Sequence, residues 1–170
     1  MAKQRVLIPV DGSDASLQIL PQVRKLLRPG ETEIVLFRVG VEPEGWAEGP
    51  DRQLAVNFDG SIFPSQGQPR PSHQIYATQE EESRRTAIED ELQKELKALR
   101  EDGYEVSAEI RFGKPAEEIR AYAASNQVDL IAMTTHGRTG IKRLIAGSVA
   151  EEVVRTVKVP ILLLRPFRAE

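Results

Sequence analysis

Apolar or alternating stretches of strand length recur along the 170 residues of this chain, separated by segments with helical periodicity. They predict five β-strands, at 5–10, 33–39, 104–112, 128–134 and 160–164. Strands that are apolar throughout are buried on both faces, and their alternation with helices predicts a parallel sheet. We expect an α/β fold, a doubly wound five-stranded parallel sheet in the order 3-2-1-4-5, with helices on both faces.

The first helix should follow the first strand directly. Ser13 stands at the strand end and is a candidate N-cap. Pro21 lies within the helix and lacks an amide hydrogen, so we expect it to bend the helix. The Pro29-Gly30 pair then ends it.

Three further helices are expected. The longest, at 78–100, carries an apolar stripe, and Thr78 with Glu81 fits a capping box. The next covers 115–125, with proline at its first position. The last opens after Gly147, beside the fourth strand.

The segment 41–77, after the second strand, differs in character. Proline and glycine recur through it and no helical period survives, so we predict an insert within a single domain spanning 1–170. Inside it, LAVNFDGSIF flanks an Asp59-Gly60 turn and predicts a small hairpin. Because the insert leaves from the carboxyl end of a strand, we hypothesise that it covers a ligand site or forms a dimer surface.

Composition narrows the classes of function. The 23 Lys and Arg against 26 Asp and Glu give a net charge of -3, which argues against binding to nucleic acid or to an anionic membrane. There is no cysteine, so disulfides and thiolate metal sites are excluded. The first apolar run is too short for a signal peptide, and no run approaches the ~18 residues of a membrane span. We therefore expect a cytoplasmic protein.

Glycines gather where this fold binds ligands, at the carboxyl ends of the strands. Gly137, Gly140 and Gly147 line the loop after the fourth strand, and the helix that follows offers unpaired amides to an anion. This predicts phosphate binding, although neither the P-loop nor the dinucleotide fingerprint is present. A second interpretation needs no ligand, because Ser148 with Glu151 fits a capping box.

Several linked motifs resemble those of one family. THGRTG and GSVAEEVV, with nine residues between Gly137 and Gly147, resemble the nucleotide-binding motif of the universal stress protein family. VLIPVDGSDAS, GKPAEEI, VDLIAMTTHGRTG and VPILLLRP resemble that family as well, over nearly the whole chain. The resemblance implies that the protein binds ATP. AMP or ADP are alternatives, and Mg²⁺ would be carried on the phosphates.

The resemblance also implies roles for individual residues at the base end of the nucleotide. Asp11 would meet the adenine, and Val39 would contact it through its backbone. Pro9 and Val10 would line the same pocket, and Met133 would pack near the nucleoside.

At the phosphate end, the resemblance implies that backbone amides and one hydroxyl hold the phosphates. These belong to Gly137, Gly147, Ser148 and Val149. Arg138 would neutralise phosphate charge, as arginine does elsewhere.

Three residues leave alternatives open. Thr134 stands where the family pattern has its first glycine, so its side chain would either crowd the ribose or add a hydrogen bond. Asp11 also fits a turn residue or an N-cap partner of the first helix, which needs no ligand. His136 could be read as a general base, but a lone histidine in a glycine loop is more often a packing or turn residue.

The leading hypothesis is an ATP-binding regulatory stress-response protein that acts as a nucleotide-dependent switch. We find no carboxylate pair, activated nucleophile or metal cluster of the kind that fast phosphoryl transfer needs, so turnover would be slow at most. One alternative is an interaction or chaperone-like protein of the same fold that binds no nucleotide. Another is a slow ATPase or phosphotransfer enzyme.

The last strand predicts an interface. An apolar edge strand must be covered or paired, and the stretch from Val159 to Leu164 is apolar. The family resemblance implies a homodimer that pairs these strands across a two-fold axis.

Overall fold

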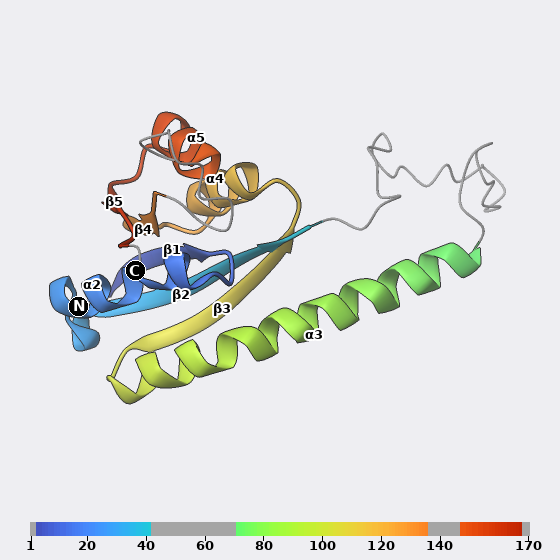
Figure 1. The fold of residues 1–170 in the computed structure, drawn as a ribbon, viewed down its shortest axis with the longest axis horizontal. Helices are drawn as coiled ribbons and strands as arrows, with labels where there is room; N and C mark the ends of the chain where they lie inside the picture. Colours follow the sequence, from blue (N-terminus) through green and yellow to red (C-terminus); the bar gives the residue numbers. More distant parts are fainter. Residues whose placement is uncertain (1–2, 42–70, 136–146, 168–170) are drawn as a thin grey trace, which may run out of the picture.

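Five parallel strands form a single sheet in the order β3-β2-β1-β4-β5 (Figure 1). The computed structural model describes residues 3–41, 71–135 and 147–167, except for the side chains of 71–81. The strands are β1 Gln4–Val10, β2 Thr32–Gly40, β3 Glu105–Phe112, β4 Leu130–Thr134 and β5 Ile161–Leu164. The predicted fold class and strand order are thus confirmed.

Helices cover both faces of this sheet. One face carries α1 (Asp14–Leu17), α2 (Ile19–Leu26) and α3 (Pro71–Glu101), and the other carries α4 (Pro115–Ser125) and α5 (Ser148–Thr156). A 3₁₀ turn, η1 (Pro29–Glu31), links α2 to β2. Successive strand residues point to opposite faces. Val6 and Ile8 therefore join the core under α2 and α3, whereas Leu7 joins the core under α4 and α5.

The sheet winds outward in both directions from β1. β1 pairs with β2 on one side, where Val10 lies opposite Arg38, and with β4 on the other, where Leu7 lies opposite Ile131. The strand order reverses direction between the neighbours β1 and β4. This is the topological switch point, and doubly wound sheets bind ligands at the carboxyl ends of the strands there. The loops after β1, β2 and β4 all leave the sheet at this edge.

The first helix is broken, as its proline predicts. Ser13 is the N-cap of α1, and its Oγ accepts a hydrogen bond from the Ser16 amide at 3.2 Å. The helix is interrupted at Gln18, and α2 continues from Ile19. A proline ring clashes with the carbonyl four residues earlier, which for Pro21 is that of Leu17. The break therefore falls just after Leu17.

The start of the long helix was predicted wrongly. α3 begins at Pro71 rather than at Thr78, so Thr78 and Glu81 lie inside the helix and not at its start, where a capping box belongs. The last part of the expected insert, 71–77, is thus helical, and 42–70, with the predicted hairpin, lies outside the described residues. Proline has a backbone angle that suits the first helical position, and Pro71 occupies that position.

The two ends of α3 have different surroundings. Towards its C-terminus, Leu92, Leu96 and Leu99 are buried against the sheet. Its N-terminal part runs past the carboxyl ends of β2 and β3 (Figure 1). The helix therefore passes directly over the edge at which the strands end.

Candidate functional site

A pocket of about 380 Å³ lies at the carboxyl ends of β1, β2 and β3, beneath α3. Asp11 comes from the end of β1 and Val39 from the end of β2, so two residues predicted for the base end line the same pocket. The remaining lining residues come from β2 and the residue after it, from β3 and from α3, and they are Arg38, Gly40, Val41, Arg84, Ala87, Ile88 and Phe112. The pocket thus combines a carboxylate, two guanidinium groups and apolar walls.

Asp11 is held by the turn that follows it. Its Oδ1 accepts hydrogen bonds from the Ser13 amide at 3.0 Å and from the Ser13 hydroxyl at 2.5 Å. Its own amide donates to the Ser16 hydroxyl at 3.3 Å. The geometry expected of a turn residue is therefore present. These contacts with Ser13 fix the orientation of the Asp11 carboxylate at the end of β1.

The other predicted base-end residues lie beneath the edge. Val10 and Met133 are each 5% exposed and belong to the cores on opposite faces of the sheet. Thr134 is 7% exposed, and Pro9 is half-buried. None of these four lines the pocket, so the structure places them as support for the edge, next to the pocket rather than in it.

At the phosphate end, the start of α5 differs from the sequence-based interpretation. Gly147 is the N-cap, Ser148 is the first helical residue, and the Glu151 amide donates to the Gly147 carbonyl at 2.9 Å. A capping box from Ser148 to Glu151 is therefore wrong. Because glycine has no side chain, the first turn of α5 receives no side-chain cap from its N-cap residue.

One amide predicted to hold a phosphate is engaged within the protein. The Gly147 N–H donates to the Thr135 carbonyl, and the Thr135 N–H donates to the Leu164 carbonyl at 2.8 Å. These bonds tie the two ends of the loop after β4 to each other and to β5. Two other amides predicted to hold a phosphate lie among the described residues: that of Ser148, which is exposed, and that of Val149, which packs partly into the core.

The middle of this loop, 136–146, lies outside the described residues. The predictions for Gly137 and Arg138, and the alternatives for His136, fall in it. Among the described residues, no group of three or more His, Asp or Glu side chains could hold a metal ion. In the same part of the chain, no helix is long and apolar enough to cross a membrane.

Sequence reasoning missed Arg38. It is only 8% exposed, and its Nη2 lies 3.6 Å from Oε2 of Glu91 on α3. The signal was present, because a charged residue interrupts the apolar run EIVLFRVG just before its end. A buried charge is costly unless it is paired, and the guanidinium pairs with Glu91 at the edge where the pocket lies.

Phe112 was also missed, because it depends on contacts between distant segments. Its ring packs on Gly40, where an added Cβ would lie 2.6 Å from Cε1 of the ring. The Arg85 guanidinium lies 5.7 Å from the ring centroid, and its Nη1 donates to the Ile110 carbonyl at 3.2 Å. The aromatic wall of the pocket is thus held between β2 and α3.

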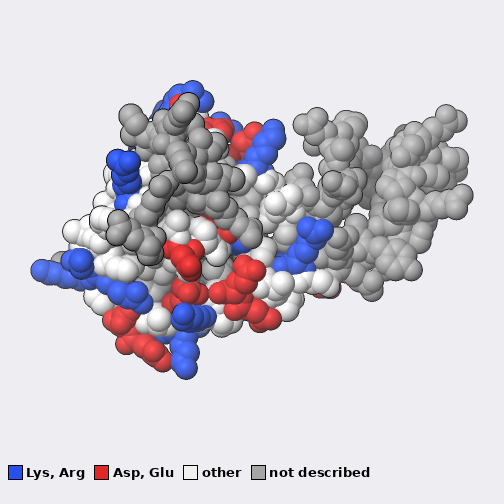
Figure 2. Space-filling model, viewed as in Figure 1, with Lys and Arg blue, Asp and Glu red and all other residues white. Residues whose placement is uncertain are grey.

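The surface around these elements carries charges of both signs. Figure 2 shows Lys and Arg interspersed with Asp and Glu on the described part of one face. Local pairs rather than one extended field therefore characterise this side of the described surface.

Comparison with known proteins gives a consistent result. The model of the universal stress protein family matches residues 46–165. Universal stress protein MJ0531 of Methanocaldococcus jannaschii is 28% identical over 168 residues, which cover 98% of this chain and 85% of that protein.

Solved structures agree in fold. The structure of MJ0577, from the same archaeon, has a TM-score of 0.74 at 22% identity and covers 99% of this chain and 100% of that one. A family protein of Arabidopsis thaliana with AMP bound has a TM-score of 0.60 at 18% identity, covering 96% and 92%. A universal stress protein in complex with cAMP has a TM-score of 0.58 at 17% identity, covering 98% and 100%.

Proposed function

Because this chain belongs to the universal stress protein family, we propose that it is a regulatory protein that binds ATP and switches its conformation or its partner with the state of the nucleotide. AMP or ADP would occupy the same site with fewer phosphates. The relatives that contain AMP and cAMP support a nucleotide as the class of ligand. Mg²⁺ would be carried by the phosphates.

The proposal rests on two features at the carboxyl ends of the strands, a pocket and the start of a helix. Asp11 and Val39 line a pocket at the ends of β1 and β2. α5 begins at Ser148 in the loop after β4, and β4 is the neighbour of β1. A helix N-terminus attracts anions, so a ligand with a ring at one end and phosphates at the other matches this edge.

Two measurements test the proposal. Mass spectrometry of the small molecules released by denaturing freshly purified protein identifies any nucleotide that it carries. Thermal unfolding with and without ATP measures binding, and ATP at 100 times its Kd should stabilise the fold by about 2.7 kcal/mol. The absence of both a released nucleotide and a stabilisation would reject nucleotide binding.

A matched pair of variants locates the site. Asp11→Asn keeps an oxygen that can accept from Ser13, so the turn survives, but the charge is lost. We expect ATP affinity to fall about tenfold, since bonds to charged groups are the stronger ones. Asp14→Asn, in the exposed first turn of α1, is the control and should leave affinity unchanged.

A second candidate function is an interaction protein that binds no nucleotide. Three observations favour it: Thr134 replaces a glycine, the Gly147 amide is engaged by Thr135, and one Asp11 oxygen is engaged by Ser13. Under this hypothesis, ATP, ADP and AMP would all fail to shift the unfolding temperature.

We further propose that 1–170 is one domain and that it forms homodimers through β5.

The hypothesis that the insert covers the site or forms a dimer surface concerns residues outside those described. Deleting 45–70 and measuring both nucleotide affinity and oligomeric mass tests it. If neither quantity changes, both versions of the hypothesis are wrong.

A further inference from the structure

Phe112 ends an apolar row on one face of β3. Val106 and Ala108 pack against the core under α3, and because successive strand residues point to opposite faces, Phe112 lies on the same side. Arg111 points the other way, where its guanidinium lies 5.3 Å from the ring centroid of Tyr122 on α4. Phe112 is only half-buried and lines the pocket, so part of its ring lies against open space rather than protein.

Two neighbours hold this ring in place. Gly40 lies opposite Phe112 in the ladder between β2 and β3, and a Cβ added to Gly40 would lie 2.6 Å from Cε1 and 2.7 Å from Cδ1 of the ring. Gly40 does not have a positive φ, so the close approach of the ring, and not the backbone conformation, excludes a side chain there. The guanidinium of Arg85 lies over the ring, 5.7 Å from its centroid. The ring is therefore held in one orientation without a ligand.

We propose that Phe112 is a specificity-determining residue whose ring packs against the base of the bound nucleotide and favours purines over pyrimidines. The inference rests on the proposed nucleotide binding and names a residue of β3 for it. Such a contact depends on the area of the base rather than on hydrogen bonds, since every base has a π-face. A purine has two fused rings and a pyrimidine has one, so a purine gains more from the contact.

The surroundings of the ring suit a flat ligand. Ile88 of α3 reaches the same point, because its Cδ1 would lie 3.3 Å from a Cβ added to Gly40. Phe112 and Ile88 thus form an apolar wall, and apolar walls with a few placed polar groups are typical of sites for small molecules. Asp11 and Val39 line the same pocket from β1 and β2. The wall therefore belongs to the end of the site predicted for the base.

ATP and CTP are a matched pair of probes for this contact. Both bases carry an exocyclic amine beside a ring nitrogen that accepts, and both nucleotides carry the same ribose and phosphates. They therefore differ chiefly in the area of the ring system. Calorimetric titration of the wild-type protein should show that ATP binds about tenfold more tightly than CTP. This comparison needs no variant, so it does not depend on a substituted protein folding.

Variants then assign the effect to the ring. Phe112→Leu keeps an apolar side chain but removes the ring, so the ratio of the two affinities should fall to about twofold or less. Phe112→Tyr keeps the ring and should preserve the wild-type ratio. Phe167→Leu is the matched control, because this phenylalanine is 73% exposed and lies outside the pocket, and its ratio should be that of the wild type.

Gly40→Ala tests the positioning of the ring. The added Cβ would displace Phe112 while leaving every side chain that lines the pocket in the sequence. We expect ATP affinity to fall by a larger factor than CTP affinity. Urea unfolding of each variant shows whether it is folded, and if Phe112→Leu is not, the wild-type titration and Gly40→Ala decide the question.

Three outcomes would overturn the proposal. If ATP and CTP bind the wild type equally, nucleotide binding stands but base area is not read. If Phe112→Leu or Gly40→Ala weakens both nucleotides by the same factor, Phe112 acts through the fold. If neither nucleotide binds the wild type, the proposed function fails and this inference fails with it, which the titration with ATP alone distinguishes from the first two outcomes.

Discussion

At the scale of single residues, the turn after β1 is the most constrained part of the site. Gly12 has φ +78°, a left-handed conformation that glycine adopts without steric cost. Its missing side chain also leaves room for the guanidinium of Arg38 and the carboxylate of Glu91. Backbone shape and charge placement therefore depend on the same residue.

Replacing this glycine should be costly. Gly12→Ala puts a side chain into the left-handed region and places its Cβ 2.9 Å from the Arg38 guanidinium. We expect the free energy of unfolding to fall by about 1–3 kcal/mol, measured by urea denaturation. Gly30→Ala is the control, because no atom lies within 4 Å of its added Cβ. Equal effects of the two substitutions would show that neither strain nor the guanidinium contact matters.

At the scale of elements, sequence patterns predicted what depends on local order. Apolar or alternating runs located all five strands, and Ser13 and Pro21 located the start and the break of the first helix. The helix over 71–77 was missed because the proline and glycine content before it masked Pro71 as a start signal. Arg38 and Phe112 could not be placed in a pocket, because their partners come from α3, far along the chain.

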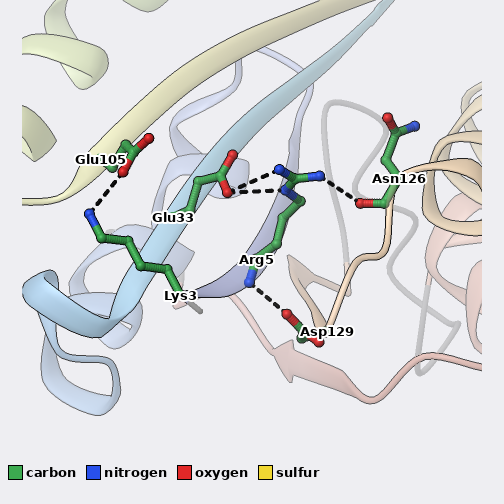
Figure 3. A network of polar contacts seen from close by, with 6 residues as sticks. All are labelled: Lys3, Arg5, Glu33, Glu105, Asn126 and Asp129. Carbon is green, nitrogen blue, oxygen red and sulfur yellow. Dashed lines mark hydrogen bonds and ion pairs between the residues drawn. The ribbon is translucent and has the colours of Figure 1, made fainter. Parts of the chain in front are cut away.

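At the amino ends of the strands, opposite the site, Arg5 links neighbouring segments of the chain. Figure 3 shows its guanidinium between Glu33 of β2 and the Asn126 carbonyl after α4, at 3.2 Å and 2.8 Å. Arg5→Met should lower the free energy of unfolding by about 1 kcal/mol while leaving ATP affinity unchanged. Urea unfolding and titration measure the two quantities.

Lys3 provides the control for this substitution. Its pair with Glu105 at 2.8 Å is exposed on both sides, so Lys3→Met should leave the unfolding midpoint unchanged. A loss of ATP affinity in Arg5→Met would contradict the expectation that the amino ends of the strands do not affect the site at their carboxyl ends.

Tyr104 joins the start of β3 to the end of α2 and should make the fold sensitive to alkali. Its hydroxyl donates to the Leu27 carbonyl at 2.8 Å, and burial raises its pKa above the ordinary value. The unfolded chain therefore loses this proton first as pH rises. Stability from this group is complete below about pH 10 and is lost as the pH rises through the higher folded-state pKa.

Tyr104→Phe tests that linkage. We expect it to lower the free energy of unfolding at pH 7 by about 1 kcal/mol and to flatten the decline between pH 9 and about 11. Part of the decline should remain, because burial also raises the pKa of Tyr122. Denaturant unfolding across this pH range measures both effects, and an unchanged slope would rule out Tyr104 as a contributor.

At the scale of the whole molecule, the two outer strands of the sheet have different surroundings. β3 lies at one edge, and α3 packs along it (Figure 1). β5 lies at the other and pairs only with β4 among the described strands. The loop after β4 is bonded to β5 through Thr135 and Leu164, so an interface on β5 would be mechanically connected to the phosphate end of the site.

A homodimer through β5 is the last prediction, and it follows from this edge. Leu163 is 39% exposed, and among the described strands β5 pairs on one side only. Apolar edge strands are normally covered or paired. Sedimentation velocity should give twice the 19.0 kDa chain mass.

Leu163→Lys would bring two like charges together across the two-fold axis and should weaken the dimer about a hundredfold or more. Leu26→Lys, on α2 and 62% exposed, should leave the mass unchanged. A monomeric wild type, or a Leu163→Lys variant that stays dimeric, would place the interface elsewhere or remove it. If the dimer forms, ATP should alter its dissociation constant, because the same loop contacts both β5 and the start of α5.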